Sequence, residues 1–360
     1  MSRPIRALID IRALEQNLQL LRAKSASRFL WGVVKADAYG HGLTALLPSF
    51  DNWVDGLALL DPKEGVEIRK AGWAKPILLI EGIFSPEDLH TADEYGLETV
   101  IHNERQVKWL QEASLKNTIR IHIKCNTGMN RLGFRPSEIP SLLFKLNMLP
   151  KVEVVDLLAH FANAEKTYPQ DKPVTVNKQL SELVSLRGLL PMCLSNTGGI
   201  LWHESGDDAV RAGIAMYGVS PDDHISSEEL GIEPVMTLET EIIAIQNLQV
   251  GEASGYGSKF VAERPTRLAV IACGYADGYP RRPNPDREVL LHGKKAPVVG
   301  NVSMDMMTVD VTDVPEANLG SKVTLWGKGL PVNDVAKGFG TIGYELLCDV
   351  NRRVPRLLVK

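Results

Sequence analysis

The chain has 360 residues, of which 44% are hydrophobic and 23% are charged, and its formal net charge is −4 at pH 7. These values are typical of a globular protein of about two domains, and the small net charge gives no electrostatic reason to expect nucleic acid or an anionic membrane as a partner. The first residues lack the continuous apolar segment of a signal peptide, and no later run approaches the ~18 apolar residues of a membrane span.

The first two-thirds of the chain alternates apolar runs of strand length with helical stretches. After an opening strand at 6–11 and a helix at 14–24, eight strands are predicted at 29–36, 54–60, 76–81, 99–102, 119–125, 152–160, 192–195 and 209–217. Capping residues followed by acids at 61–64, 85–88 and 103–104 predict helix starts between them. This pattern favours a (β/α)₈ TIM-like barrel, with a doubly wound open sheet as the weaker alternative.

Lys35 stands just where the apolar run 29–34 stops. An amine held among apolar neighbours loses hydration, so its neutral form becomes available for Schiff-base chemistry. The alternative is an ordinary lysine whose amine reaches water at the end of a strand. The other residues at strand ends decide between the two interpretations.

In a barrel of this type, chemistry gathers where the strands end, and phosphate usually sits beyond the last two strands. Those positions hold Lys35, Arg131, His160, the run 195–199 (Ser-Asn-Thr-Gly-Gly) and the run 211–214 (Arg-Ala-Gly-Ile). Singly, Arg131 could be a surface charge, His160 a core histidine, and the glycines turn formers. Their convergence on one rim favours a site.

From about Pro234 the helical spacing disappears, and strands are predicted at 236–246, 267–273, 288–291, 297–299, 306–311 and 322–326. We therefore predict a barrel domain at 1–233 and a mostly antiparallel β domain at 234–360, with the opening strand 5–11 able to pack with the second domain. Glycine-flanked tyrosines, Tyr256, Tyr275 and Tyr344, occur in this part. They are either presented phenols or structural tyrosines.

The four cysteines, Cys125, Cys193, Cys273 and Cys348, are scattered and form no C-x-x-C pair. This spacing indicates reduced thiols in a cytoplasmic protein and disfavours both a disulfide frame and a zinc site.

Eight blocks spread through the whole chain resemble the alanine racemase family in the order of that family. The blocks are 34–42 (VKADAYGHG), 127–133 (TGMNRLG), 160–162 (HFA), 210–214 (VRAGI), 255–257 (GYG), 274–278 (GYADG), 303–305 (SMD) and 343–345 (GYE). A lone lysine motif would be weak, but eight ordered blocks are specific.

The resemblance implies a racemase that interconverts L-alanine and D-alanine with pyridoxal 5′-phosphate, bound covalently by Lys35 as a Schiff base. Lys35 would act as the acid–base group for the D-isomer. Tyr256 would act for the L-isomer on the opposite face, reaching in from the partner subunit of a homodimer with shared active sites. Two groups are needed because a planar Cα must lose its proton on one face and regain it on the other.

The resemblance also assigns supporting roles around the cofactor. Arg211 would face the pyridine nitrogen and, because arginine stays protonated, would keep that nitrogen unprotonated. His160 would link Arg211 to Tyr256. The residues expected to hold the phosphate are Tyr39, Ser195, Gly213, Ile214 and Tyr344.

Arg131 and the backbone of Met304, the latter from the other subunit, would hold the substrate carboxylate. Lys124 lies where many relatives carry a carbamylated lysine that orients this arginine. Positions along the access route of the substrate match Tyr275, Arg281, Glu165 and Ile342, and the alternative is that these residues form solvated surface. Asp305 stands beside Met304 as a supporting residue. Asp37 departs from the asparagine of many relatives and adds a negative charge near Lys35.

Three other functions stay open at this point. A racemase for serine or lysine would need a roomier pocket. A non-catalytic pyridoxal-phosphate carrier would lack the β domain, and a decarboxylase would lack the tyrosine base. The sequence also leaves open whether D-alanine is supplied for peptidoglycan or alanine is degraded.

Overall fold

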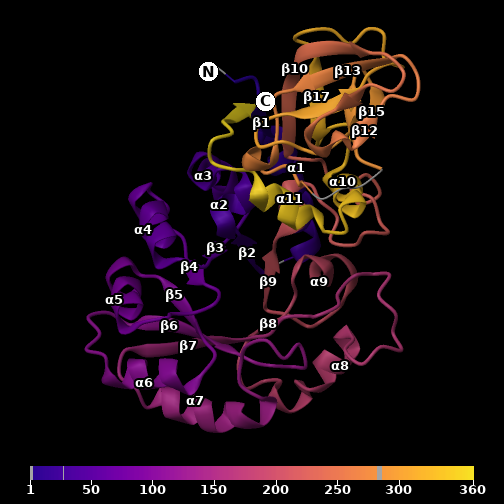
Figure 1. Cartoon of the computed structure of the whole chain (residues 1–360). Helices are drawn as coiled ribbons and strands as arrows, with labels where there is room; N and C mark the ends of the chain where they lie inside the picture. Colours follow the sequence, from indigo (N-terminus) through magenta and orange to yellow (C-terminus); the bar gives the residue numbers. More distant parts are fainter. Residues whose placement is uncertain (1–2, 27, 282–285) are drawn as a thin grey trace. The chain divides into compact units, whose positions relative to one another are not determined.

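The computed structural model describes residues 3–26, 28–281 and 286–360 and divides into two units. The barrel unit comprises Leu18–Ala38 and Leu43–Met216, and the β unit comprises Met1–Asn17, Tyr39–Gly42 and Tyr217–Lys360. Figure 1 shows the helices and strands of both units.

Eight parallel strands close into a barrel in the barrel unit, with each strand paired to the next and the last paired to the first. The strands are β2 (Phe29–Val33), β3 (Gly56–Leu59), β4 (Ile77–Leu79), β5 (Glu98–Ile101), β6 (Ile119–Lys124), β7 (Val152–Leu158), β8 (Met192–Cys193) and β9 (Ala209–Ala212). Most of their side chains are buried, as expected for parallel strands covered on both faces. The predicted barrel is confirmed.

Helices follow most of the barrel strands, and Figure 1 shows α4 to α7 on the outside of the barrel unit. Asp61, Ser85 and Asn103 cap α4, α5 and α6 with their side chains, which confirms the three predicted helix starts. The helices of this part of the chain are α1 (Ile11–Ser25), α2 (Lys35–Gly40), α3 (Leu43–Asp51), α4 (Pro62–Lys70), α5 (Pro86–Tyr95), α6 (Glu104–Glu112), α7 (Ile139–Asn147), α8 (Val176–Ser181) and α9 (Thr197–Trp202), with 3₁₀ turns η1 (Pro136–Glu138), η2 (Val184–Leu186) and η3 (Ile214–Tyr217).

The β unit is built on an eight-stranded sheet in the order β13-β16-β15-β14-β17-β10-β1-β18, and β10 also pairs with β13 so that the sheet curls back on itself. Its strands are β1 (Arg6–Asp10), β10 (Met236–Leu248), β11 (Ala253–Ser254), β12 (Phe260–Val261), β13 (Thr266–Ile271), β14 (Glu288–Leu291), β15 (Lys294–Val299), β16 (Met307–Asp310), β17 (Lys322–Trp326) and β18 (Arg356–Val359). Two helices, α10 (Val332–Gly338) and α11 (Gly343–Asp349), and two 3₁₀ turns, η4 (Tyr256–Ser258) and η5 (Tyr275–Asp277), complete it. The predicted mostly antiparallel β fold is confirmed, and β1 pairs antiparallel with β10 and parallel with β18.

Several predicted strands are shorter in the structure. The run predicted as a strand at 209–217 ends at Ala212, because Gly213 leads into η3. The run at 192–195 pairs only over β8, since Asn196 already caps α9. No prediction was made for β18, α10 or α11. Among the described residues, no helix is both long and apolar enough to cross a membrane.

The core of the barrel holds a charged triad on three neighbouring strands. His122 on β6 has no exposed surface, and its ring lies 2.8 Å from Glu98 Oε2 through Nε2 and 2.8 Å from Asp156 Oδ1 through Nδ1. The Trp31 ring on β2 meets the His122 ring edge-on at 5.8 Å, which places the triad inside the barrel. Burial alone would lower the pKa of His122, but Asp156 and Glu98 raise it to about 9.

This triad makes barrel stability depend on pH. Because the folded pKa of His122 exceeds its unfolded value, its contribution is complete below about pH 6.5 and is lost as pH rises through about 9. The shift corresponds to roughly 3 kcal/mol.

We expect the urea midpoint of the wild-type protein to fall between pH 6.5 and 9, relative to a Glu98→Gln/His122→Gln/Asp156→Asn variant whose triad cannot titrate. Parallel pH profiles for the two proteins would contradict this assignment.

Candidate active site

Lys35 follows β2 and begins α2, and the backbone of this short helix is left-handed. Residues 36–39 have φ angles of 52° to 55°, although none of them is glycine. A left-handed conformation costs about 1–2 kcal/mol for each such residue. Gly40 ends the run at a φ of 79°, where a Cβ would come within 2.2 Å of Leu347 O. The chain therefore adopts a costly geometry just after the lysine, and neighbouring contacts must hold it.

Hydrogen bonds within the barrel unit supply that support. The Ala38 N–H donates to Val34 O (2.8 Å), and the Leu43 N–H donates to Asp37 Oδ1 (2.7 Å). The Glu64 carboxyl accepts the backbone N–H of Asp37. An asparagine oxygen at position 37 could accept the same bond from Leu43, so the departure noted at Asp37 preserves this contact.

A cluster of cations surrounds His160 at the carboxyl end of the barrel. Burial, followed by the positive charges of Arg211, Lys124, Arg131 and Lys35, lowers the pKa of His160 well below its ordinary value. His160 is therefore neutral at physiological pH. The structure therefore brings residues that the sequence places at strand ends close enough to interact electrostatically: Lys35, Arg131, His160 and Arg211.

Neutral acceptors hold the guanidinium of Arg211 in place. Its Nη1 donates to Cys193 O (2.6 Å) and Cys193 Sγ (3.0 Å), and its Nη2 donates to Ala159 O (2.7 Å) and Leu194 O (3.0 Å). Nη2 also lies 3.4 Å from His160 Nδ1. Because His160 is neutral, this geometry favours the tautomer whose Nδ1 accepts and whose Nε2 carries the proton. Arg211 is buried and keeps its full charge.

Lys124 and Arg131 are joined by a loop that folds back on the end of β6. The Phe134 N–H donates to Lys124 O (2.9 Å), and the Asn126 N–H donates to Phe134 O (2.8 Å). Lys124, Arg131 and His160 line one small cavity. Lys124 is buried while Arg131 is exposed, so the arginine is the member of this pair open to a ligand.

Two hydroxyl groups, those of Ser195 and Thr197, lie near the last two strands. Ser195 is fully buried, and its hydroxyl donates to Asp207 Oδ2 (2.5 Å) and lies 2.8 Å from Ser205 Oγ. Thr197 was missed by the sequence analysis, yet its hydroxyl accepts the Gly213 N–H (2.9 Å) and so stands between the loops after β8 and β9. We therefore add Thr197 to Ser195 as a candidate hydroxyl for the phosphate. The sequence offers this candidate, because Thr197 stands two residues after Ser195 in the same loop.

Aromatic rings gather around Tyr39 in the β unit. The Tyr39 ring lies 4.8 Å from the Tyr217 ring and 6.1 Å from the Tyr344 ring, centroid to centroid, and His41 stacks on Tyr217 at 4.7 Å. Burial, followed by the nearby Cys348, raises the pKa of Tyr39, so its phenol stays protonated and can donate a hydrogen bond. The structure thus brings together two of the predicted phosphate ligands, and it adds Tyr217, which the sequence analysis had read as part of a strand.

The remaining predicted residues of the β unit lie at its surface. Tyr256 is 74% exposed and Met304 is 53% exposed, and the side chains of Tyr275, Ile342 and Arg281 are exposed as well. Two left-handed glycines, Gly255 and Gly257, flank Tyr256 and hold it in η4. Of the other two assignments, Ile214 is fully buried and Glu165 is half-buried.

Both parts of the chain match family models. The model described as the alanine racemase N-terminal domain matches residues 9–221, and the alanine racemase C-terminal domain matches residues 235–358.

Full-length relatives carry the same description. An alanine racemase of Erwinia tasmaniensis is 45% identical over 357 residues, which cover 99% of each chain. An alanine racemase of Nitrosomonas eutropha is 43% identical over 364 residues, and the match covers the full length of both chains. The crystal structure of the biosynthetic alanine racemase from Pseudomonas aeruginosa superposes with a TM-score of 0.94 at 37% identity, covering 99% of this chain and all of that one.

Lys124 is a buried amine whose protonation state can be tested directly. Burial, followed by the charges of Arg211 and Arg131, lowers its pKa to about 7. A neutral amine of this kind can add carbon dioxide, and the resulting carbamate would place an anion between two arginines.

At a fixed concentration of dissolved, isotopically labelled carbon dioxide, we expect an NMR carbamate signal at pH 8 that falls by more than about tenfold at pH 6, because Lys124 becomes protonated and because carbamate formation itself releases a proton. Lys124→Met should abolish the signal, and the matched change at an exposed lysine, Lys108→Met, should leave it. A signal that survives in Lys124→Met would refute the assignment.

Proposed function

The chain belongs to the alanine racemase family, and we propose that it interconverts L-alanine and D-alanine with Lys35 and Tyr256 as the two acid–base groups. It is an amino-acid racemase, an isomerase. The observation that carries the proposal is that the family models span both parts of the chain, while Lys35 stands at the barrel mouth inside a field of cations.

Pyridoxal phosphate fits the donor groups that this chain provides. Lys35 supplies a primary amine for covalent attachment, and Arg131 and Arg211 supply positive charge for an anionic ligand. Ser195, Thr197, Tyr39 and Tyr344 would donate hydroxyl groups to the phosphate, near the Gly213 and Ile214 backbone. When bound, the cofactor withdraws electrons from the substrate Cα and so makes its proton acidic.

Arg211 would set the reaction type. The acceptors of its guanidinium are backbone carbonyls, a thiol and an imidazole, so no carboxylate offsets the positive charge that arginine carries. At the ring nitrogen of the cofactor, this cation disfavours a second positive charge. Negative charge at Cα is then less delocalised and short-lived, and rapid return of the proton favours racemisation over transamination.

Lys35 and Tyr256 would serve opposite faces of the substrate, Lys35 for the D-isomer and Tyr256 for the L-isomer. Neutral His160 can donate through Nε2 to the Tyr256 oxygen and so favour the deprotonated phenol. The large exposure of Tyr256 and Met304 supports their use in the site of a partner subunit, because neither side chain is covered within its own unit.

We further propose a homodimer with two shared sites, each completed by the partner's β domain at 234–360. Arg131 and the backbone N–H of Met304 would bind the substrate carboxylate. Tyr275, Arg281, Ile342 and Glu165 would line the access route. Cytoplasmic production of D-alanine for peptidoglycan is the role most in keeping with the family.

The test of the function is a substrate panel. Purified protein loaded with pyridoxal phosphate should racemise alanine with a kcat/KM at least about tenfold above those for serine and lysine, the discrimination expected of a pocket fitted to one methyl group. The two directions should have equal kcat/KM, since the enantiomers are equally stable. Lys35→Ala should abolish activity and the visible absorption band of the bound cofactor.

Faster turnover of serine or lysine would identify a different racemase. Cofactor binding without racemisation of any amino acid would favour the non-catalytic carrier.

A further inference from the structure

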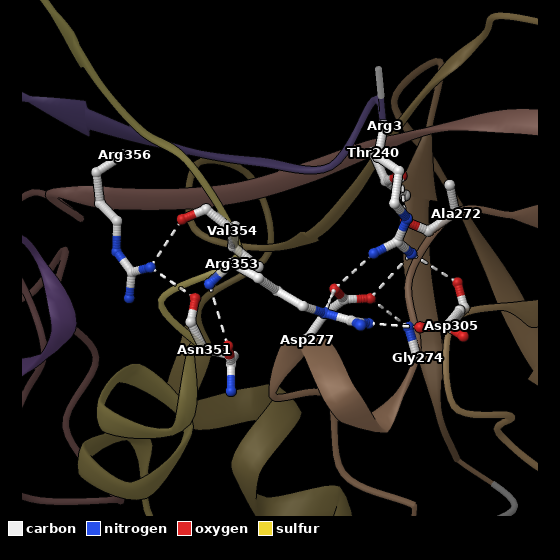
Figure 2. Close-up of polar contacts among 10 residues, drawn as sticks. All are labelled: Arg3, Thr240, Ala272, Gly274, Asp277, Asp305, Asn351, Arg353, Val354 and Arg356. Atoms are coloured by element: carbon white, nitrogen blue, oxygen red, sulfur yellow. Dashed lines mark hydrogen bonds and ion pairs between the residues drawn. The ribbon is translucent and has the colours of Figure 1, made fainter. Parts of the chain in front are cut away.

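Asp277 is a buried carboxylate in the β unit to which neither the fold nor the proposed reaction has yet given a role. It ends η5, and its side chain has no exposed surface. Figure 2 shows it between two arginines from the two ends of the chain. Arg3 donates to its two oxygens (2.8 and 3.2 Å), and Arg353 Nε donates to Oδ1 (2.7 Å). Burial would raise the pKa of Asp277, but these hydrogen bonds hold it below its usual value.

The same two arginines also bind the loop that carries Met304. Arg3 Nη2 donates to Asp305 O (2.8 Å), and Arg353 Nη2 donates to Asp305 Oδ1 (2.7 Å) (Figure 2). Two cations and two carboxylates thus form a balanced cluster, which we call the Asp277 clamp: Arg3, Asp277, Asp305 and Arg353. The clamp ties η5 and the Met304 loop to both chain ends.

Backbone contacts connect η5 directly to the Met304 peptide. Asp277 Oδ2 accepts the Gly274 N–H (2.9 Å) and so fixes the start of the turn. The next N–H, from Tyr275, donates to Ser303 O (3.1 Å), and that of Ala276 donates to Met304 O (3.0 Å).

The approach of these two segments is close enough to require glycine at position 274. A Cβ there would lie 2.3 Å from Ser303 O and 2.4 Å from Met304 O. Any side chain at this position would therefore push the Met304 loop away from η5.

The planarity of the peptide bond carries this constraint to the other side of the loop. Ser303 O and the Met304 N–H belong to one trans peptide, in which the C=O and the N–H point in opposite directions. Because Tyr275 holds Ser303 O toward η5, the Met304 N–H must point away from it. The turn that Asp277 anchors therefore sets the direction of this N–H.

We infer that Asp277 is a positioning residue for the substrate carboxylate, which acts through Tyr275 N and Ser303 O to aim the Met304 N–H. The inference rests on the proposed function, in which Met304 binds that carboxylate. Arg3 and Arg353 hold Asp277 and Asp305 in register. Asp277 itself touches no reacting atom.

The test separates carboxylate binding from turnover. In Asp277→Asn, KM for alanine and the inhibition constant of propionate, which retains the carboxylate but lacks the amine, should both rise about tenfold, the change expected when a hydrogen bond to a charged group is weakened. The value of kcat and the absorption of the bound cofactor should stay near those of the wild type. Gly274→Ala should produce the same pattern without removing a charge.

Arg353→Lys and Arg353→Gln are milder variants that keep the test decisive if Asp277→Asn does not fold. The lysine variant keeps the charge but loses the fork, so propionate affinity should fall in the order wild type, Lys, Gln. Asp313→Asn is the matched control, because it breaks a bidentate pair of the same unit, Arg264 with Asp313 (3.2 and 2.5 Å), at an exposed site. It should leave KM and propionate inhibition unchanged.

Unchanged propionate inhibition in folded Asp277 or Arg353 variants would overturn the inference. A fall in kcat with unaltered KM would also overturn it, since a merely structural role lowers only the number of active molecules. A wild-type protein that racemises no alanine would instead refute the proposed function, so the two failures are distinguishable.

Discussion

Four basic side chains at one end of the barrel determine the electrostatics of this site. Lys35, Lys124, Arg131 and Arg211 act together on His160 and, with burial, keep its imidazole neutral. Like charges repel, so the fold holds Arg211 with backbone carbonyls and holds Arg131 on a loop that returns to β6. An anionic cofactor and a substrate carboxylate would relieve that repulsion, and for this reason the site favours such ligands. The left-handed backbone of residues 36–39 adds a second energetic cost, that of backbone strain, next to Lys35.

Two other clusters of buried charge, one in each unit, contain groups of both signs. In the barrel core, His122 lies between Glu98 and Asp156, and Arg120 also pairs with Glu98. The Asp277 clamp balances two arginines against two carboxylates. A buried charge is tolerated when it is hydrogen-bonded and paired, whereas removal of one partner leaves a costly orphan. This contrast distinguishes two roles. The His122 triad and the Asp277 clamp stabilise the fold, whereas the basic residues around His160 are suited to bind an anionic ligand.

Much of this architecture was predictable from the sequence, and the features that were not predicted were missed for identifiable physical reasons. Apolar runs and capping residues predicted the barrel because its strands are buried on both faces and its helices begin at Asp61, Ser85 and Asn103. The left-handed turn was not predictable, since Ala36 to Tyr39 carry no glycine to signal it. Thr197 was given no role of its own because only packing shows that the Ser195 hydroxyl is already bonded to Asp207. The Asp277 clamp joins residues 274 positions apart, and no local pattern encodes that contact.

The proposed function requires that Lys35 and Tyr256 meet from two different chains. The direct measurement is the racemase activity of purified mixed dimers, made from differently tagged Lys35→Ala and Tyr256→Ala subunits. If each site takes one residue from each chain, a mixed dimer has one doubly defective site and one intact site, so it should recover about half the activity of the wild-type dimer. Mixed dimers no more active than either parent would contradict the account, because both residues would then serve the same chain.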